Sequence, residues 1–411
     1  MLMYRIFLLT FFISSSIFSL AQTLKSGTWH FTLTREGGLP VYTIAEMAIK
    51  NQQWQITFIN DTERILVEQT SLTGDSLNFS MPFFETAFQL KLTADGILTG
   101  TMTKGTSFAT QVWKANAVYG AGARIPQSKG TAAVNISGRW AVKFQRTDGS
   151  WRPAVAEWKQ TGNKLTGTII NPSGDYRFLE GEVWDHHLFV TAFDGSHIYA
   201  FQATIINDST IEKGIFFSGN PPGDSFRAKK NAMAKLPELA QVAELKPDES
   251  SIAFRFPDTD SNLVSLNDDR FNNKVVVVQL MGSWCPNCMD ETKFLSEYYN
   301  NQKIKEVEIV SLAYELSTDF QRSANSLQKF KNRFGVQYPM LITGARSADP
   351  EKAAKTLPQL TDIKYFPTTL FIDKKGRVRK VHNGFYGPGA GEYFEKYKTE
   401  FFETIEALKG E

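Results

Sequence analysis

Cysteine is nearly absent from this sequence, which holds only Cys285 and Cys288 among 411 residues. One pair three residues apart cannot staple distant segments, because so small a ring hardly restricts the unfolded chain. A four-ligand zinc site is not expected either. The five histidines form no second ligand pair beside the cysteines: His30, His186, His187, His197 and His382. The pair is therefore expected to carry redox chemistry.

Strong charge of either sign is lacking too. The chain has 45 Lys and Arg against 43 Asp and Glu, a net charge of +2, with the two signs interspersed. This balance gives no sign of a nucleic-acid partner or a membrane-binding surface. Beyond the N-terminus no apolar run is long enough to span a bilayer.

The N-terminal segment 1–21 resembles a secretory signal. Arg5 precedes an apolar, uncharged run over 6–20, and Ser19-Leu20-Ala21 offers a small-x-small cleavage site. No cysteine follows that could carry a lipid. We expect export, to the periplasm in a Gram-negative host, and a soluble protein after cleavage. An uncleaved N-terminal membrane anchor is the alternative.

Residues 22–228 are expected to be all-β. Short runs that alternate between apolar and polar residues, such as 54–58, are typical of half-buried antiparallel strands. Pairs such as Asp148-Gly149 and Asp194-Gly195 predict tight turns between them.

This region also shows an apparent internal duplication. Ser26-Gly27-Thr28-Trp29 and the residues after it align without gaps on Ser137-Gly138-Arg139-Trp140, and 98–101 resembles 165–168 at a different offset. We therefore predict two all-β units, 22–125 and 126–228, each a small barrel or sandwich or both paired into one body.

A charged segment, 229–250, contains two prolines and is expected to be a linker. Residues 251–411 then alternate between strand and helix patterns, which predicts an α/β domain. The predicted strands are 274–281, 307–314, 339–343, 368–373 and 378–382, and the predicted helices are 288–300, 320–334, 350–357 and 392–408. The continuous valine run at 275–278 predicts a central strand covered on both faces.

Two motifs in this domain resemble the thioredoxin superfamily: Trp284-Cys285-Pro286-Asn287-Cys288 after a buried strand, and Phe366-Pro367-Thr368-Thr369 before another. Within it, residues 251–411 are most similar to the exported TlpA/ResA-type thiol-disulfide oxidoreductases. Their signatures, Cys-x-x-Cys-x-x-Glu and Pro-Thr-Thr before a strand with Ile-Asp, are met by Cys285, Cys288 and Glu291 and by 367–373. The resemblance implies a central mixed sheet flanked by helices.

Cys285 is the expected nucleophile. A helix N-terminus stabilises a thiolate, so Cys285 should be the attacking and more exposed sulfur and Cys288, one turn later, the buried resolving thiol. Pro286 presets the first helical residue. Neither Pro286 nor Asn287 adds a cation, which favours a reductant over a strong oxidant.

Glu291 follows Cys288 by three residues, on the same helical face. A partly buried carboxylate there could take the proton of the resolving thiol. Gln279, on the preceding strand, occupies the position where thioredoxin has a buried Asp, and it cannot titrate. The alternative is an exposed Glu that only favours the helix dipole.

The remaining site residues come mainly from the resemblance. It implies a cis peptide bond at Pro367, beside the disulfide, where substrate backbone would pair. Phe366 and Pro286 would flank that surface. Trp284 is expected at the rim of the site, or as a core residue.

The sequence therefore predicts an exported thiol-disulfide oxidoreductase that acts on protein thiols or disulfides and needs neither metal nor organic cofactor. A third cysteine is lacking, so electrons must pass to or from a separate partner, such as a membrane-borne reductase. Two alternatives stay open: a thiol peroxidase, and a ligand- or protein-binding β-module with an accessory redox domain.

Overall fold

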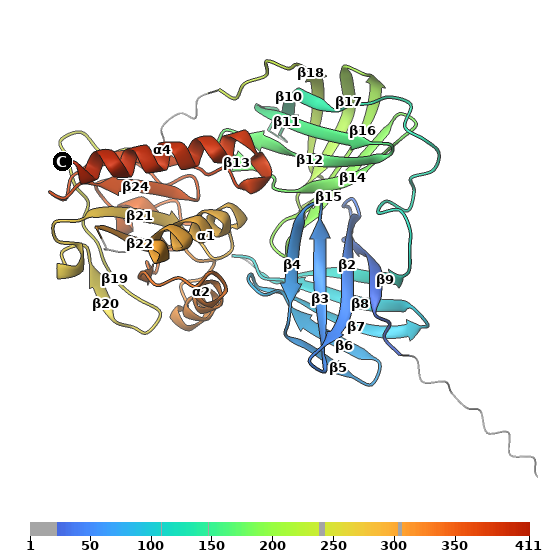
Figure 1. The fold of residues 1–411 in the computed structure, drawn as a ribbon, viewed down its shortest axis with the longest axis horizontal. Coiled ribbons are helices and arrows are strands. Elements are labelled where there is room, and N and C mark those ends of the chain that lie inside the picture. Colours follow the sequence, from blue (N-terminus) through green and yellow to red (C-terminus); the bar gives the residue numbers. More distant parts are fainter. Residues whose placement is uncertain (1–22, 108, 147, 238–242, 303–305) are drawn as a thin grey trace, which may run out of the picture.

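The computed structural model describes residues 23–107, 109–146, 148–237, 243–302 and 306–411. The chain forms two strand-rich bodies that lie beside a C-terminal α/β domain (Figure 1). The predicted signal segment 1–21 lies outside the described residues. No helix in the described ranges is long and apolar enough to cross a membrane.

The first strand-rich body, β unit 1, is an antiparallel sheet of nine strands in the order β4-β3-β2-β1-β9-β8-β7-β6-β5. Its first and last strands, β1 and β9, pair with each other, which bends the meander towards a barrel. The strands are β1 Gly27–Thr34, β2 Val41–Lys50, β3 Gln53–Asn60, β4 Glu63–Val67, β5 Thr70–Thr73, β6 Ser76–Ser80, β7 Thr86–Ala94, β8 Ile97–Lys104 and β9 Gln111–Tyr119.

The second body, β unit 2, is a closed barrel. Its sheet also has nine strands, and all of them except the short β13 form a ring that the β10–β18 and β11–β12 pairings close. The strands are β10 Gly138–Gln145, β11 Trp151–Thr161, β12 Lys164–Asn171, β13 Gly174–Asp175, β14 Leu179–Trp184, β15 His187–Phe193, β16 Ile198–Asn207, β17 Thr210–Phe217 and β18 Asp224–Lys230. The prediction of an all-β N-terminal region is confirmed.

The start of the predicted repeat is also confirmed. The β1–β2 and β10–β11 hairpins pair in the same register, with aligned residues at equivalent places. Trp29 and Trp140 are both fully buried. Each indole N–H donates to the carbonyl four residues earlier, Lys25 at 2.9 Å and Ile136 at 2.8 Å.

The match between 98–101 and 165–168 is wrong as a structural equivalence. The first segment lies in β8, next to the last strand of β unit 1, and the second lies in β12, the third strand of β unit 2. Because half-buried strands share one two-residue period and one composition, such short stretches recur in unrelated strands.

The C-terminal domain contains a mixed five-stranded sheet in the order β23-β22-β21-β24-β25, parallel from β23 to β21 and antiparallel beyond. Its strands are β21 Val275–Met281, β22 Val307–Ala313, β23 Met340–Ile342, β24 Thr368–Ile372 and β25 Val378–Asn383, and a small second sheet holds β19 Arg255–Pro257 and β20 Leu263–Ser265. The helices are α1 Pro286–Asn301, α2 Phe320–Phe334, α3 Lys352–Thr356 and α4 Glu392–Lys409, with short 3-10 turns η1 Asp269–Phe271 and η2 Pro388–Ala390.

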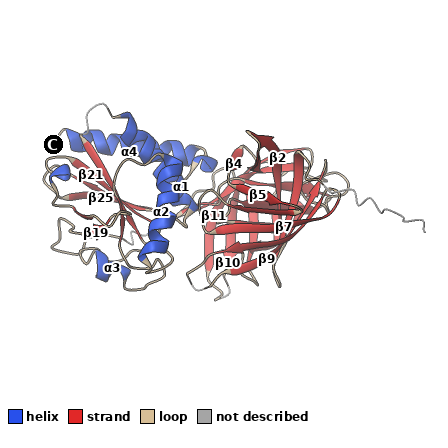
Figure 2. Ribbon diagram, turned by 90° about the horizontal axis from the view of Figure 1, so that it is seen from below, coloured by secondary structure: helices blue, strands red, loops and turns tan. Residues whose placement is uncertain are grey.

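Strand β21 lies at the centre of this sheet and is buried along its whole length, as the valine run predicts. Val275 and Val277 face the core shared with α1, α2 and α4, and Val276 and Val278 face the core that contains α3. Helices α1 and α2 lie on the side of the sheet that faces the two β units (Figures 1 and 2). The β units therefore meet the C-terminal domain at the end that carries the cysteines.

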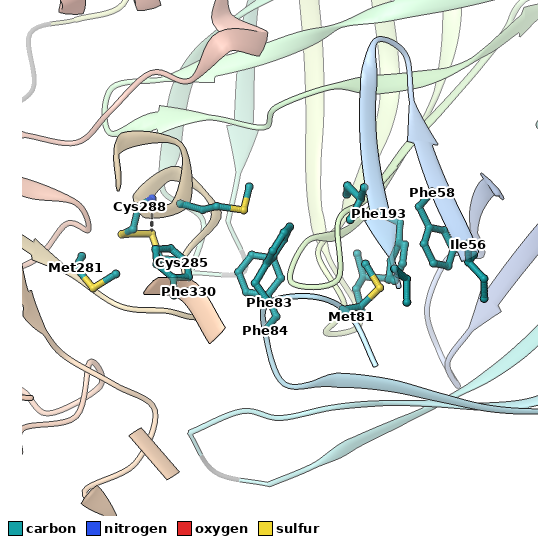
Figure 3. Close-up of a cluster of buried hydrophobic side chains, with 14 of the residues drawn as sticks. Ile56, Phe58, Met81, Phe83, Phe84, Phe193, Met281, Cys285, Cys288 and Phe330 are labelled. Carbon is teal, nitrogen blue, oxygen red and sulfur yellow. Dashed lines mark hydrogen bonds between the residues drawn. A yellow bond between two sulfur atoms is a disulfide. The ribbon is translucent and has the colours of Figure 1, made fainter. Parts of the chain in front are cut away.

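A continuous hydrophobic cluster joins β unit 1 to that end. Phe83 and Phe84, in the β6–β7 loop, lie between Cys285 on one side and Phe193 of β unit 2 on the other (Figure 3). The next residue, Glu85, accepts two hydrogen bonds from Arg322 of α2, at 2.9 and 2.5 Å. All three bodies thus contribute side chains around the cysteine motif.

The second part of the predicted linker packs against the C-terminal domain. Leu245 forms a β-bridge with Leu360, Lys246 donates to the carbonyl of Gln359 at 2.9 Å, and the carbonyl of Ser250 accepts from Val378 at 2.8 Å.

Candidate active site

Cys285 and Cys288 form a disulfide at the start of helix α1. Cys285 is the N-cap residue, and its sulfur accepts a hydrogen bond of 3.2 Å from the backbone N–H of Cys288. Pro286 occupies the first helical position, where no N–H is needed. The helix therefore starts two residues before its predicted start, because the cysteine sulfur itself caps it.

Both cysteines are buried. Cys285 is 5% exposed and Cys288 is 0% exposed, so Cys285 is the more accessible sulfur by a small margin. Residues of β unit 2 line the cavity beside Cys285, and residues of both β units line a second cavity that reaches Trp284. Sequence reasoning did not establish this contact between the β region and the site.

The Phe366–Pro367 peptide bond is cis, which confirms the predicted conformation. The carbonyl oxygen of Phe366 lies 3.5 Å from the sulfur of Cys285. Trp284 packs edge-on against the Phe366 ring, with centroids 5.7 Å apart, and donates its indole N–H to the Tyr314 carbonyl at 2.9 Å. Trp284, Pro286 and Phe366 thus lie around Cys285, and Trp284 is only partly buried.

Glu291 is fully buried in helix α1, so the alternative of an exposed glutamate is wrong. Its carboxylate accepts three hydrogen bonds: from Gln279 Nε2 at 2.8 Å, Thr369 Oγ1 at 2.7 Å and the Tyr397 hydroxyl at 2.7 Å. The amide oxygen of Gln279 in turn accepts from Thr292 at 3.1 Å. The residue that stands where thioredoxin has an Asp therefore orients Glu291.

Burial raises the pKa of Glu291, and the three donors only partly oppose that rise. A carboxyl whose pKa is raised can hold a proton nearer to neutral pH than an exposed glutamate can. Glu291 and Cys288 lie one turn apart on the same face of α1. The placement is compatible with proton exchange between them.

A second buried carboxyl supports the loop before the cysteines. Glu315, just after β22, accepts hydrogen bonds from the backbone N–H and the hydroxyl of Ser283, at 2.8 and 2.6 Å. Burial raises its pKa from 4.5 to about 7. It also lines a cavity of about 560 Å³ together with Trp284 and residues of both β units.

The β12–β13 hairpin of β unit 2 lies directly against the motif. Gly174 forms a β-bridge with Phe385, whose carbonyl also accepts from Asn287 Nδ2 at 3.1 Å. A Cβ atom on Gly174 would lie 2.0 Å from Asn287 Nδ2, so only glycine allows this approach. Ser196, in the β15–β16 turn, donates to the carbonyl of Trp284 at 2.7 Å.

Arg177, just after this hairpin, forms a buried charge cluster that joins all three bodies. Its guanidinium pairs with Glu63 of β unit 1, Asp194 of β unit 2 and Asp290 of α1. It also lies 3.4 Å from the carbonyl of Pro286. Three carboxylates thus compensate one buried cation.

A cavity of about 210 Å³ lies over Cys285, and β unit 2 forms its far wall. Among its lining residues are Tyr176, His197, Tyr199, Trp284, Cys285 and Phe366. His197 and Arg177 are site residues that the sequence analysis missed. The available signal was the Asp194-Gly195 pair, which by itself predicts only a turn. Among the described residues no group of His, Cys, Asp or Glu could hold a metal ion.

The model of the Redoxin family matches residues 241–395 and therefore begins inside the segment expected to be a linker. The thiol-disulfide oxidoreductase ResA of Halalkalibacterium halodurans is 24% identical over 157 residues, which are 38% of this chain and 76% of that protein. ResA of Geobacillus kaustophilus is 30% identical over 114 residues, 28% of this chain and 57% of that protein.

Among solved structures, a thiol:disulfide interchange protein from Chlorobium tepidum TLS has 18% sequence identity and a TM-score of 0.30. The match covers 41% of this chain and 99% of that one. The relatives cover the C-terminal part of the chain. Residues 241–395 are a Redoxin domain of thioredoxin-like fold, similar to the thiol-disulfide oxidoreductase ResA, and they make this protein an oxidoreductase.

Proposed function

We propose that the protein is an exported thiol-disulfide oxidoreductase that exchanges disulfides with other exported proteins and acts as a reductant. The observation that carries the proposal is the Cys285–Cys288 disulfide at the N-terminus of α1, beside cis-Pro367 and one turn from the buried Glu291. The similarity to ResA supports the same chemistry.

In the first step, the Cys285 thiolate attacks a sulfur of the substrate disulfide. A new S–S bond forms between Cys285 and the substrate, the substrate's own S–S bond breaks, and its second sulfur leaves as a thiolate that takes up a proton. The first-turn N–H groups of α1, including that of Cys288, favour the thiolate on Cys285.

In the second step, Cys288 resolves the mixed disulfide. Its thiol gives a proton to Glu291, and the resulting thiolate attacks Cys285, which releases the substrate's first sulfur. The substrate disulfide has then gained two electrons, and the cysteine pair is oxidised to the disulfide. A separate thiol partner, for which we propose a membrane-borne reductase, must return it to the dithiol.

Trp284, Pro286, Phe366 and Pro367 are the proposed substrate-binding residues, since they surround Cys285. With Cys285 only 5% exposed, a folded substrate surface does not reach the sulfur in this arrangement. A cysteine on an extended segment would enter more readily, or the β units would have to move aside.

The proposal is tested by equilibrating the cysteine pair with a series of glutathione redox buffers and reading the thiol state by mass after alkylation. A potential near that of thioredoxin, about −270 mV, supports a reductant, and one near −120 mV would make the protein an oxidant. Cys285→Ser is the control, because it lacks the attacking thiol and should exchange no disulfide. If the native protein exchanges no disulfide with glutathione or a peptide, the proposal fails.

Two alternative functions can be tested with the same purified protein. A thiol peroxidase would consume hydrogen peroxide in a Cys285-dependent reaction faster than it exchanges disulfides. A binding module formed by the β units would use the cavity of about 560 Å³ between the three bodies, whose volume is in the range of small-molecule sites. A ligand that binds Cys285→Ser and the native protein alike would favour that function.

A further inference from the structure

The cavity over Cys285 has two walls of different origin. One wall belongs to the C-terminal domain and includes Trp284, Cys285 and Phe366. The other belongs to β unit 2 and includes His197 and Tyr199. The nucleophilic sulfur and an imidazole from a different domain therefore share one small cavity of about 210 Å³.

A buried carboxylate lies beside the imidazole. Asp194 Oδ2 lies 3.0 Å from His197 Nδ1, and Asp194 Oδ1 accepts the His197 backbone N–H at 2.6 Å. The ring stacks on Tyr199, with centroids 4.3 Å apart and an angle of 25°. Asp194 Oδ2 lies at ion-pair distance from Nδ1 without the geometry of a hydrogen bond, so we assign the proton exchange to Nε2.

The turn that carries His197 is fixed to the redox motif. Ser196 donates its hydroxyl to the carbonyl of Trp284 at 2.7 Å, one residue before Cys285. Lys104 of β unit 1 donates to the carbonyl of Ser196. The position of His197 relative to Cys285 is therefore set by direct contacts.

We propose that His197, oriented by Asp194, is the proton carrier for Cys285, so that β unit 2 supplies a catalytic group to the Redoxin domain. This inference rests on the proposed disulfide exchange. In the reduced protein the Cys285 thiol gives its proton to His197 Nε2, which leaves a thiolate beside an imidazolium. When the substrate disulfide breaks, the imidazolium returns that proton to the leaving thiolate, so protons and electrons balance within one exchange.

The charges around the pair of Asp194 and His197 favour this assignment. Although burial alone would raise the pKa of Asp194, His197 and Arg177 lower it to about 2, so Asp194 is ionised when His197 takes a proton. Arg177 already pairs with Glu63, Asp194 and Asp290, so its charge is not free to balance a new thiolate on Cys285. Further titratable or charged groups near Asp194 and His197 are Lys104, Asp175, Tyr176, Tyr199 and Arg152.

The test compares His197→Gln with His187→Gln, which replaces an exposed histidine of the same barrel. The pKa of Cys285 is read in the reduced protein from the pH dependence of its alkylation. We expect His197→Gln to raise that pKa by about one unit and to slow exchange near neutral pH about tenfold, and His187→Gln to change neither. Asp194→Asn should change the pKa in the same direction.

If His197→Gln exchanges disulfides with an unchanged Cys285 pKa and pH profile, the inference is overturned while the proposed function stands. A native protein without exchange would instead overturn the function itself. If the variant does not fold, the native protein provides a second test. This test is NMR of the histidine ring protons as a function of pH in the disulfide and dithiol forms. The ring-proton signals of His197 should change between the disulfide and dithiol forms at a pH where the Cys285 thiolate forms, and identical signals in both forms would contradict the proposal.

Discussion

Arg177 of β unit 2 pairs with Asp290, which lies two residues after Cys288 in helix α1. The two residues are 113 positions apart in sequence, and their side chains are 4% and 10% exposed. Glu63 of β unit 1 binds the same guanidinium. One buried cation thus connects the three bodies at the mouth of the active site.

Arg177→Met should destabilise the protein and expose Cys285. Removing the guanidinium leaves buried carboxylates without their partner, which costs about 3–5 kcal/mol. Urea unfolding should show this loss in the free energy of unfolding, and alkylation of the reduced protein should become faster at Cys285. Arg152→Met is the matched control, because the Arg152–Asp224 pair is about a quarter exposed and should contribute only about 0–1 kcal/mol. Equal losses in both variants would contradict this prediction.

Gly174→Val should displace the β12–β13 hairpin from the redox motif. The new Cβ would lie 2.0 Å from Asn287 Nδ2 and 3.0 Å from the Phe385 carbonyl, so the contact cannot persist unchanged. We expect alkylation of Cys285 to become about tenfold faster. This factor corresponds to ~1.4 kcal/mol less free energy in favour of the arrangement in which the hairpin packs on the motif. Gly122→Val is the control, because the nearest atoms to its Cβ would be 3.8 Å away. An unchanged alkylation rate in Gly174→Val would show that the hairpin does not limit access.

Glu291→Gln should slow the resolving step. Without a carboxylate one turn from Cys288, the resolving thiol loses its proton acceptor, and the rate should fall by about 10², the lower end for general acid–base catalysis. The mixed disulfide between Cys285 and a peptide should then accumulate and be visible by mass. Glu297→Gln, which changes an exposed residue of the same helix, should resolve at the native rate. Fast resolution in Glu291→Gln would assign the proton to another group.

Glu315 should make stability depend on pH. Its pKa is raised in the folded state, from 4.5 to about 7, so the folded protein binds more protons than the unfolded chain between these values. Stability should therefore fall as pH rises from about 4.5 to about 7, by up to about 3 kcal/mol. Glu315→Gln should lack this decline, and Glu297→Gln should retain it. Unfolding free energies in urea at pH 4 to 8 check the difference, and parallel native and Glu315→Gln curves would refute it.

Much of the C-terminal domain could be predicted because its signals are local. The valine run of β21 and the helical pattern that ends α2 before Gly335 depend only on neighbouring residues. The candidate redox site was equally visible, since Cys285, Cys288 and Glu291 lie within two turns of one helix. The cis bond before Pro367 was expected from the resemblance alone.

The β units were less predictable. Alternation indicated strands and the aligned Trp29 and Trp140 indicated a repeat, but neither could show which strands pair. Pairing depends on register and closure across the whole sheet, and this is why the match between 98–101 and 165–168 was misleading.

By itself, the sequence determined the chemistry available to this protein: two cysteines at a helix start, a carboxylate one turn later and a strand-rich region before them. Only the tertiary structure decided that the strand-rich region covers the cysteines and that Arg177 and His197 lie at the site. The physical reason is that these contacts join surfaces of three bodies whose residues are far apart in the sequence. Ser196 and Trp284, 88 residues apart, meet only because the β15–β16 turn fits against the start of α1, and no local pattern of residues encodes that fit.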